Sequence, residues 1–200
     1  MKKKTSANKI TILNIISTFI LQGMAFLTTP IFTRLLGATQ FGEYSLFNSW
    51  VLIFTCIMGF GISSSIGTGF YTFKDKYLPF RNSILLSSTL ICLLELLVIL
   101  FSSQFISEVI GFSVSLVLIV GVTAFAHYIV NFAQMSFIYE KRAVSNFVLS
   151  VSIAVCNVLL SIFLIYRFDE KARYLGRIYG VAFVYCLAAI IVWFVLFIKR

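Results

Sequence analysis

Residues 83–104 read SILLSSTLICLLELLVILFSSQ, a run in which Glu95 is the only charged side chain. A helix that crosses a membrane needs about 20 predominantly apolar residues, so this run predicts a membrane-spanning helix. Five further runs have the same length and character: Ile10–Phe32, Tyr44–Ile66, Phe112–Ser136, Ser145–Tyr166 and Tyr179–Ile198. The sequence therefore predicts an all-α membrane protein whose residues 1–200 form one six-transmembrane-helix bundle.

The composition excludes most other classes of protein. Hydrophobic residues make up 60% of the chain and charged residues 12%, and the mean hydropathy is +1.01. A soluble domain has roughly 45–50% apolar and about 25% charged residues. The net charge of +9 does not indicate a nucleic-acid partner, because the basic residues stand between the apolar runs. The four cysteines stand singly in apolar runs, so we expect no disulfide, metal or cofactor.

The distribution of basic residues predicts the orientation of the chain. Eleven of the sixteen Lys and Arg residues fall on the side that holds both termini. Because basic residues concentrate on the cytoplasmic side, we expect both termini to be cytoplasmic. The connection RFDEKARYLGR, residues 167–177, opposes this rule with four bases on the outer side.

Polar residues form stripes along three of the predicted helices, at spacings that place them on one helix face. The stripes comprise Asn14, Thr18 and Gln22; Thr123, His127, Asn131 and Gln134; and Asn146, Ser150, Asn157 and Ser161. A helix that faces only lipid has no use for such a stripe. Either these side chains hydrogen-bond between helices, for about 0.6 kcal/mol each, or they line a cavity for a polar cargo. We name Asn14, Thr18, Gln22, Glu95, His127, Asn131 and Asn157 as cavity candidates, with an interhelical hydrogen bond expected for His127.

Two further residues stand out within the spans. A charge at the position of Glu95 costs about 2.5–3.5 kcal/mol on insertion scales, so Glu95 should face the interior and have a partner. Thr123 is the expected hydrogen-bond partner, since His127 lies roughly 9 Å away in depth. Pro30 removes a backbone hydrogen bond and predicts a kink that suits a gate.

Four segments resemble those of bacterial polysaccharide-biosynthesis transporters. They are LTTPIFTRLLGATQFGEYSLFNSW (27–50), GISSSIGTGFYTFKD (61–75), IYEKRAVSNFVLSVSIAVCNVLLSIFLIY (138–166), and Gly176-Arg177-Ile178 with Gly180. The segments and their order along the chain are similar to those of the O-antigen and repeat-unit flippases. These belong to the polysaccharide transporter family, within the multidrug/oligosaccharidyl-lipid/polysaccharide exporter superfamily.

This resemblance implies a function and a location. Such a flippase turns undecaprenyl-diphosphate-linked oligosaccharide from the cytoplasmic to the outer leaflet of the bacterial inner membrane, for lipopolysaccharide O-antigen or another surface polysaccharide. The implied partners are the lipid bilayer, the lipid-linked oligosaccharide and the polysaccharide polymerase machinery.

The resemblance also implies a MATE-like architecture of two lobes around a cationic cavity. This chain would supply the N-terminal lobe only, with the second lobe absent and the cavity completed by another lobe or a homodimer. No Lys or Arg is expected at mid-membrane here, so Arg34, toward the outer end, is the candidate contact for the diphosphate.

Two other functions stay open at this point. The chain could be a lobe of a multidrug or small-molecule exporter of the same superfamily, or a non-transporting membrane assembly subunit. We do not expect an enzyme, because Asp75 and Asp169 are the only aspartates and stand on opposite sides of the membrane. Metal-dependent lipid-phosphate chemistry needs clustered acids.

Overall fold

The computed structural model describes residues 7–198, without several side chains between residues 7 and 27 and that of Asp75. Within this part of the chain all regular structure is helical, which confirms the predicted all-α class. The helices are α1 (Ala7–Ile57), α2 (Ser65–Phe73), α3 (Tyr77–Phe101), α4 (Ser103–Ile110), α5 (Val114–Tyr139), α6 (Ala143–Ile165) and α7 (Arg173–Ile198), with short 3₁₀ segments η1 (Met58–Ser64), η2 (Lys74–Lys76) and η3 (Glu170–Ala172).

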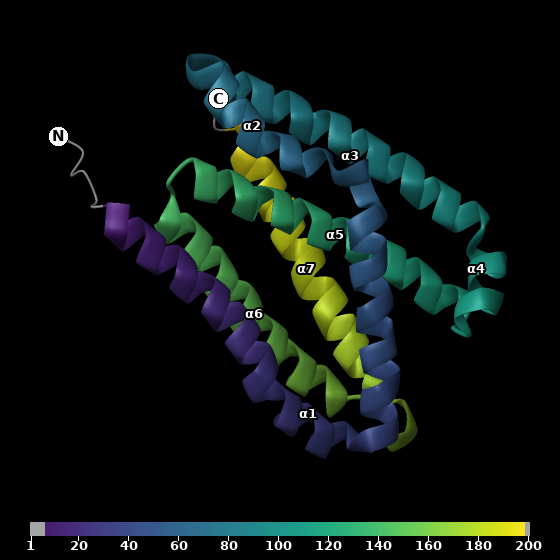
Figure 1. Cartoon of the computed structure of the whole chain (residues 1–200). Helices are drawn as coiled ribbons and strands as arrows, with labels where there is room; N and C mark the ends of the chain where they lie inside the picture. The colour runs from purple at the N-terminus through teal and green to yellow at the C-terminus, as the bar shows by residue number, and fades with distance from the viewer. Residues whose placement is uncertain (1–6, 199–200) are drawn as a thin grey trace.

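Helix α1 consists of two arms that meet at Gly37. The backbone of Gly37 is non-helical, with φ 75° and ψ 166°, and the chain turns back on itself there (Figure 1). Glycine adopts a positive φ without steric cost. Pro30 lies inside the first arm, where the dihedral angles stay helical. The interruption of α1 therefore falls at Gly37 rather than at the proline.

A second interruption separates α1 from α2. Gly59, Phe60 and Gly61 in η1 all have positive φ, at 68°, 46° and 69°. A Cβ added at Gly59 would lie 2.6 Å from the ring of Tyr128 on α5, so this position also requires a glycine. The second arm of α1 and α2 thus run in different directions (Figure 1).

The segments alternate between two ends of the bundle. Five described helical segments are long and apolar enough to cross a membrane, and the first of them, Thr28–Phe73, contains the reversal at Gly37. The start of α1, the turn between α2 and α3, the turn between α5 and α6 and the end of α7 lie toward one end (Figure 1). Gly37, α4 and the connection from α6 to α7 lie toward the other.

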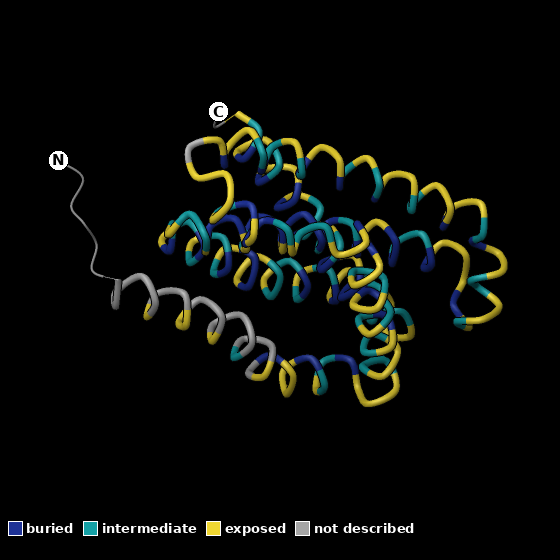
Figure 2. Tube along the Cα trace, turned by 45° about the horizontal axis from the view of Figure 1, so that its top comes forward, coloured by how far each residue is buried: buried dark blue, intermediate teal, exposed yellow. Residues whose placement is uncertain are grey.

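Helix α5 is the central helix of the bundle. In the most apolar stretch of α5, 67% of the residues are buried, whereas in that of α3 only 22% are buried. The outer helices are exposed along much of their length (Figure 2). They carry large apolar side chains, such as Phe101, which is 86% exposed. A protein surface of this kind suits lipid rather than water.

Candidate functional site

The centre of the candidate site is Arg177. Helix α7 begins at Arg173 and not at Tyr179, so Arg177 belongs to the helix rather than to the preceding connection. Its side chain is buried, and Nη1 donates hydrogen bonds to Asn157 Oδ1 at 2.8 Å and Ser161 Oγ at 2.6 Å. Two members of the polar stripe on α6 therefore hold a cation inside the bundle.

Aromatic side chains of α1 cover the guanidinium group. Its Cζ lies 3.8 Å from the ring centroid of Phe32 and 5.0 Å from that of Tyr44. A cation over an aromatic face gains about 0.5–2 kcal/mol, depending on how far it is desolvated. Because Phe32 and Tyr44 stand on opposite sides of Gly37, the reversal of α1 brings both rings to the same cation.

Two glycines bring α7 close enough to α6 for these contacts. A Cβ at Gly176 would lie 2.8 Å from the backbone nitrogen of Ile165, and a Cβ at Gly180 would lie 2.6 Å from Ser161 Oγ. Small residues four apart let two membrane helices approach to backbone contact. This spacing explains why Arg177, which lies between the two glycines, faces Asn157 and Ser161.

Arg177 has no acidic partner in the part of the chain that the structure describes. Neutral groups and ring faces surround it, and its Nε atom has no hydrogen-bond partner among the described residues. Removing a charge from water costs several kcal/mol unless other groups offset the loss. An uncompensated interior cation of this kind is suited to receive an anion.

Tyr185 continues the polar region toward mid-membrane. It lies two turns further along α7 than Arg177. Its ring stacks on that of His127, with centroids 3.6 Å apart and planes 20° apart. His127 thus contacts another helix as expected, but through a ring stack. Its Nε2 atom has no hydrogen-bond partner among the described residues.

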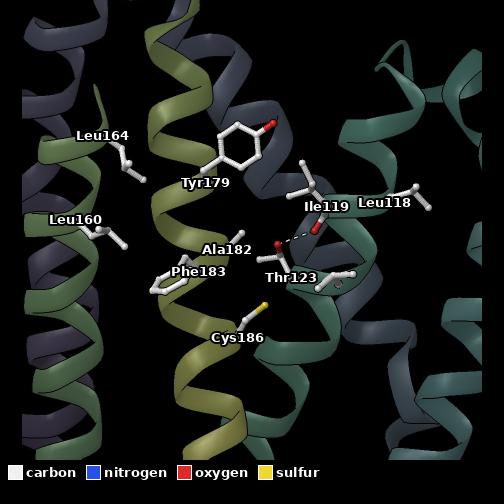
Figure 3. A pocket seen from close by; sticks show the side chains of 10 residues that line it. Leu118, Ile119, Thr123, Leu160, Leu164, Tyr179, Ala182, Phe183 and Cys186 are labelled. Carbon is white, nitrogen blue, oxygen red and sulfur yellow. Dashed lines mark hydrogen bonds between the residues drawn. The ribbon is translucent and has the colours of Figure 1, made fainter. Parts of the chain in front are cut away.

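Glu95 makes a different contact from the expected one. Its Oε2 accepts a hydrogen bond of 2.9 Å from the backbone N–H of Gly59, whereas Thr123 donates to the carbonyl of Ile119 at 2.6 Å (Figure 3). The interruption at η1 leaves backbone N–H groups without a helical acceptor, and an unpaired buried N–H is costly. The carboxylate of Glu95 satisfies one of them. Its Oε1 is buried without a partner among the described residues.

The remaining candidates lie apart from Arg177. Asn131 is exposed on α5 and Arg34 is exposed on the first arm of α1. The side chains of Asn14, Thr18 and Gln22 lie outside the described set. Of the residues named from the sequence, the structure therefore brings Asn157 to the interior cation, and Glu95, His127 and Asn131 to other places.

A second buried arginine lies at the opposite end of the bundle. Arg81 of α3 is 1% exposed, and its Nη1 is 2.5 Å from Glu140 Oε1 at the end of α5. Its Nη2 donates to the carbonyl of Leu196 on α7 at 2.7 Å. Arg142 approaches the other oxygen of Glu140 at 3.3 Å. This cluster ties α3, α5 and α7 together.

No described group of three or more His, Cys, Asp and Glu residues could hold a metal ion.

Comparison with known proteins adds one finding to this geometry. No curated protein and no solved structure shows significant similarity to the chain. The sequence model of a family described as polysaccharide biosynthesis protein matches residues 8–199, which include all the helices described above except the first residue of α1. The chain therefore belongs to the polysaccharide biosynthesis protein family.

Proposed function

We propose that this chain takes part in moving lipid-linked oligosaccharide from the cytoplasmic to the outer leaflet of a bacterial inner membrane. Family membership supports a role in polysaccharide biosynthesis, and the apolar helices support a multi-pass membrane protein. The bundle acts as one lobe, facing a second lobe or a second copy of the chain. Both ends of the chain lie on the cytoplasmic side, where most of the basic residues fall.

Arg177 is the observation that carries this proposal. The diphosphate of an undecaprenyl-linked sugar is a polyanion, and a guanidinium group binds phosphate through charge-assisted hydrogen bonds. Asn157 and Ser161 orient the guanidinium group, and Phe32 and Tyr44 cover it until α1 moves. A cation at this position also disfavours the cationic cargo of many drug exporters.

Transport in proteoliposomes tests the proposal directly. Labelled lipid-linked oligosaccharide is placed in one leaflet, and its exposure in the other is measured over time. We expect Arg177→Gln to lower the rate at least about tenfold, since one charge-assisted hydrogen bond is worth roughly 1.5–3 kcal/mol. Arg177→Lys keeps the positive charge but loses the forked set of guanidinium donors. Its transport rate should lie between those of the unmodified chain and the Arg177→Gln variant.

Arg167→Gln is the matched control. Arg167 is exposed just after α6, so its loss removes a positive charge of the same type from the connection between α6 and α7. Equal rates in the Arg177→Gln and Arg167→Gln variants would refute the role of Arg177. Absence of transport by the unmodified chain, together with association with polymerase subunits, would favour the assembly subunit instead.

A further inference from the structure

Helices α6 and α7 separate toward one end of the bundle and leave a groove between them. They are held together near Gly176 and Gly180 and diverge toward the end where α6 begins and α7 finishes (Figure 1). The groove has a volume of about 930 Å³, and its walls are almost entirely apolar, with Val148, Leu159 and Ile191 among them. Its surface therefore suits a hydrocarbon chain.

Arg142 stands at the mouth of this groove. Its side chain is 27% exposed and lines the groove beside Ser145 and Phe137. Arg142 donates to Glu140 and Ser145 over long distances of 3.3 Å, and its guanidinium group lies 4.7 Å from the Phe137 ring centroid. These contacts hold the group in place without enclosing it.

The cluster around Arg142 has an excess of positive charge. Glu140 is shared between Arg81 and Arg142, so two cations meet one carboxylate. Arg81 is buried and lies closer to Glu140 than Arg142 does. Arg142 is therefore the more accessible of the two cations. Lys141 beside it is also exposed. An anionic head group at the mouth of the groove would therefore meet complementary charge.

The length of the groove distinguishes between kinds of lipid. Its α6 wall runs from Val144 to Phe163, roughly 28 Å at 1.5 Å per residue. The hydrocarbon core of a bilayer is about 30 Å thick and is shared by two leaflets. A phospholipid chain, which occupies one leaflet, would fill about half of such a groove.

A second apolar pocket extends the groove further. It has a volume of about 550 Å³ between α5, α6 and α7, and it shares Leu160 and Phe183 with the groove. Figure 3 shows Leu160 and Leu164 of α6 on one side of it and Phe183 and Cys186 of α7 beside them. The two apolar cavities therefore adjoin at Leu160 and Phe183, and together their walls reach from Arg142 to Leu164 and Tyr179.

We propose that this groove binds the hydrocarbon chain of a long polyisoprenyl phosphate, with its phosphate at Arg142. The inference rests on the proposed function, because it assigns the cargo lipid a position at the cytoplasmic end of the bundle, which it occupies before its diphosphate reaches Arg177. A chain longer than one leaflet, fixed at one end by an anion, matches the length, the apolar walls and the single charged mouth of the groove.

Native cysteines provide the readout. Cys156 lines the groove and is exposed, Cys186 lines the second pocket, and Cys56 is exposed on α1 outside both. The purified chain in detergent is treated with a membrane-permeant maleimide in the presence of added lipid, and each cysteine's labelling is followed by mass spectrometry. Long polyisoprenyl phosphate should slow the labelling of Cys156 and Cys186 and leave Cys56 unchanged. Farnesyl phosphate should slow that of Cys156 alone.

Two variants separate the head group from the chain. Arg142→Gln should weaken the protection by polyisoprenyl phosphate about tenfold, since a charge-assisted hydrogen bond is lost, and should bring it to the level given by the neutral polyprenol. Lys171→Gln is the control, because Lys171 is exposed in η3 and does not line the groove, and it should retain the protection. Leu159→Trp, at a side chain that is 64% exposed, should fill the groove and abolish protection, whereas Leu90→Trp, 63% exposed on α3, should not.

Equal protection by phosphatidylglycerol would overturn the inference and show an ordinary lipid-facing groove. If polyisoprenyl phosphate protected the cysteines equally in the unmodified chain and in the Arg142→Gln variant, the phosphate would not bind at Arg142. The outcome is independent of transport. If the chain transports the lipid but the lipid does not slow cysteine labelling, only the lipid site in the groove is refuted. If the lipid slows labelling but the chain does not transport it, only the proposed function is refuted.

Discussion

Two arginines are buried among the residues that the structure describes, and they are compensated in opposite ways. Arg81, near one end, contacts the carboxylate of Glu140 at 2.5 Å and a backbone carbonyl at 2.7 Å. Arg177, toward the other end, contacts an amide oxygen, a hydroxyl oxygen and two aromatic rings. Each cation loses its hydration, but only at Arg81 does an opposite charge offset that loss.

The difference separates a structural site from a functional one. The Arg81 cluster joins α3, the turn between α5 and α6, and the end of α7, so its charges act as a tie between helices. The Arg177 site joins α1, α6 and α7 through weaker neutral contacts and keeps its positive charge. A bundle that needed only stability would gain from an apolar residue at position 177.

Removal of the carboxylate at the Arg81 site should have the largest effect. Glu140→Ala leaves Arg81 buried without its acidic partner and should lower the free energy of unfolding by about 3–5 kcal/mol. Unfolding by SDS in mixed micelles measures this. Glu170→Ala is the control, since Glu170 is 87% exposed in its pair with Arg173 and should cost less than about 1 kcal/mol. If both variants lowered the free energy of unfolding by similar amounts, the ion pair between Arg81 and Glu140 would not stabilise the packing of the helices.

The glycine contact that positions Arg177 should matter next. Gly180→Ala places a Cβ 2.6 Å from Ser161 Oγ and 2.9 Å from its Cα, so α7 must move away from α6. Overpacking of this kind costs roughly 1–3 kcal/mol. Gly42→Ala is the control, because nothing lies within 4 Å of that Cβ and alanine favours a helix by about 1 kcal/mol. A Gly180 variant as stable as the Gly42 variant would contradict the close contact.

Glu95 is a further ionisable side chain within the bundle, and its replacement sharpens the comparison. Glu95→Ala leaves the N–H of Gly59 unpaired and should cost about 1–3 kcal/mol. Glu95→Gln keeps an oxygen acceptor and should cost less. The same SDS titration compares the two variants. If glutamine costs as much as alanine, the charge of Glu95 matters rather than the hydrogen bond to Gly59.

Apolar runs predict the fold class because hydrocarbon demands long helices. Polar residues at helical spacing pointed to Asn157, whose Oδ1 accepts a hydrogen bond from Arg177. The ends of the helices were harder to predict. Every base between two runs was assigned to a connection, so Arg177 was placed outside although it lies in α7. The Gly176–Gly180 spacing was the available signal, since it marks a close helix contact on both sides of Arg177.

Backbone interruptions limited the prediction in a similar way. Thr123 was matched to Glu95 by depth alone, but the actual partner is an N–H group freed where Gly59, Phe60 and Gly61 leave the helical conformation. Pro30 drew attention as the expected kink, whereas the reversal of α1 uses Gly37. In both places the deciding property is a positive φ, which tertiary packing selects at some glycines and not at others.

Replacement of Arg177 should change the free energy of unfolding least. It therefore gives the most direct comparison with replacement of Arg81. Arg177→Gln removes the stacking on Phe32 and Tyr44, but it also removes the cost of a desolvated charge, and Ser161 Oγ already lies 3.3 Å from Asn157 Oδ1 and can keep that hydrogen bond. We expect the free energy of unfolding to change by less than about 1 kcal/mol, against roughly 3–5 kcal/mol for Arg81→Gln. The same titration measures both. A loss at position 177 as large as that at position 81 would mean that Arg177 ties the helices together as Arg81 does, and the distinction between the two sites would fail.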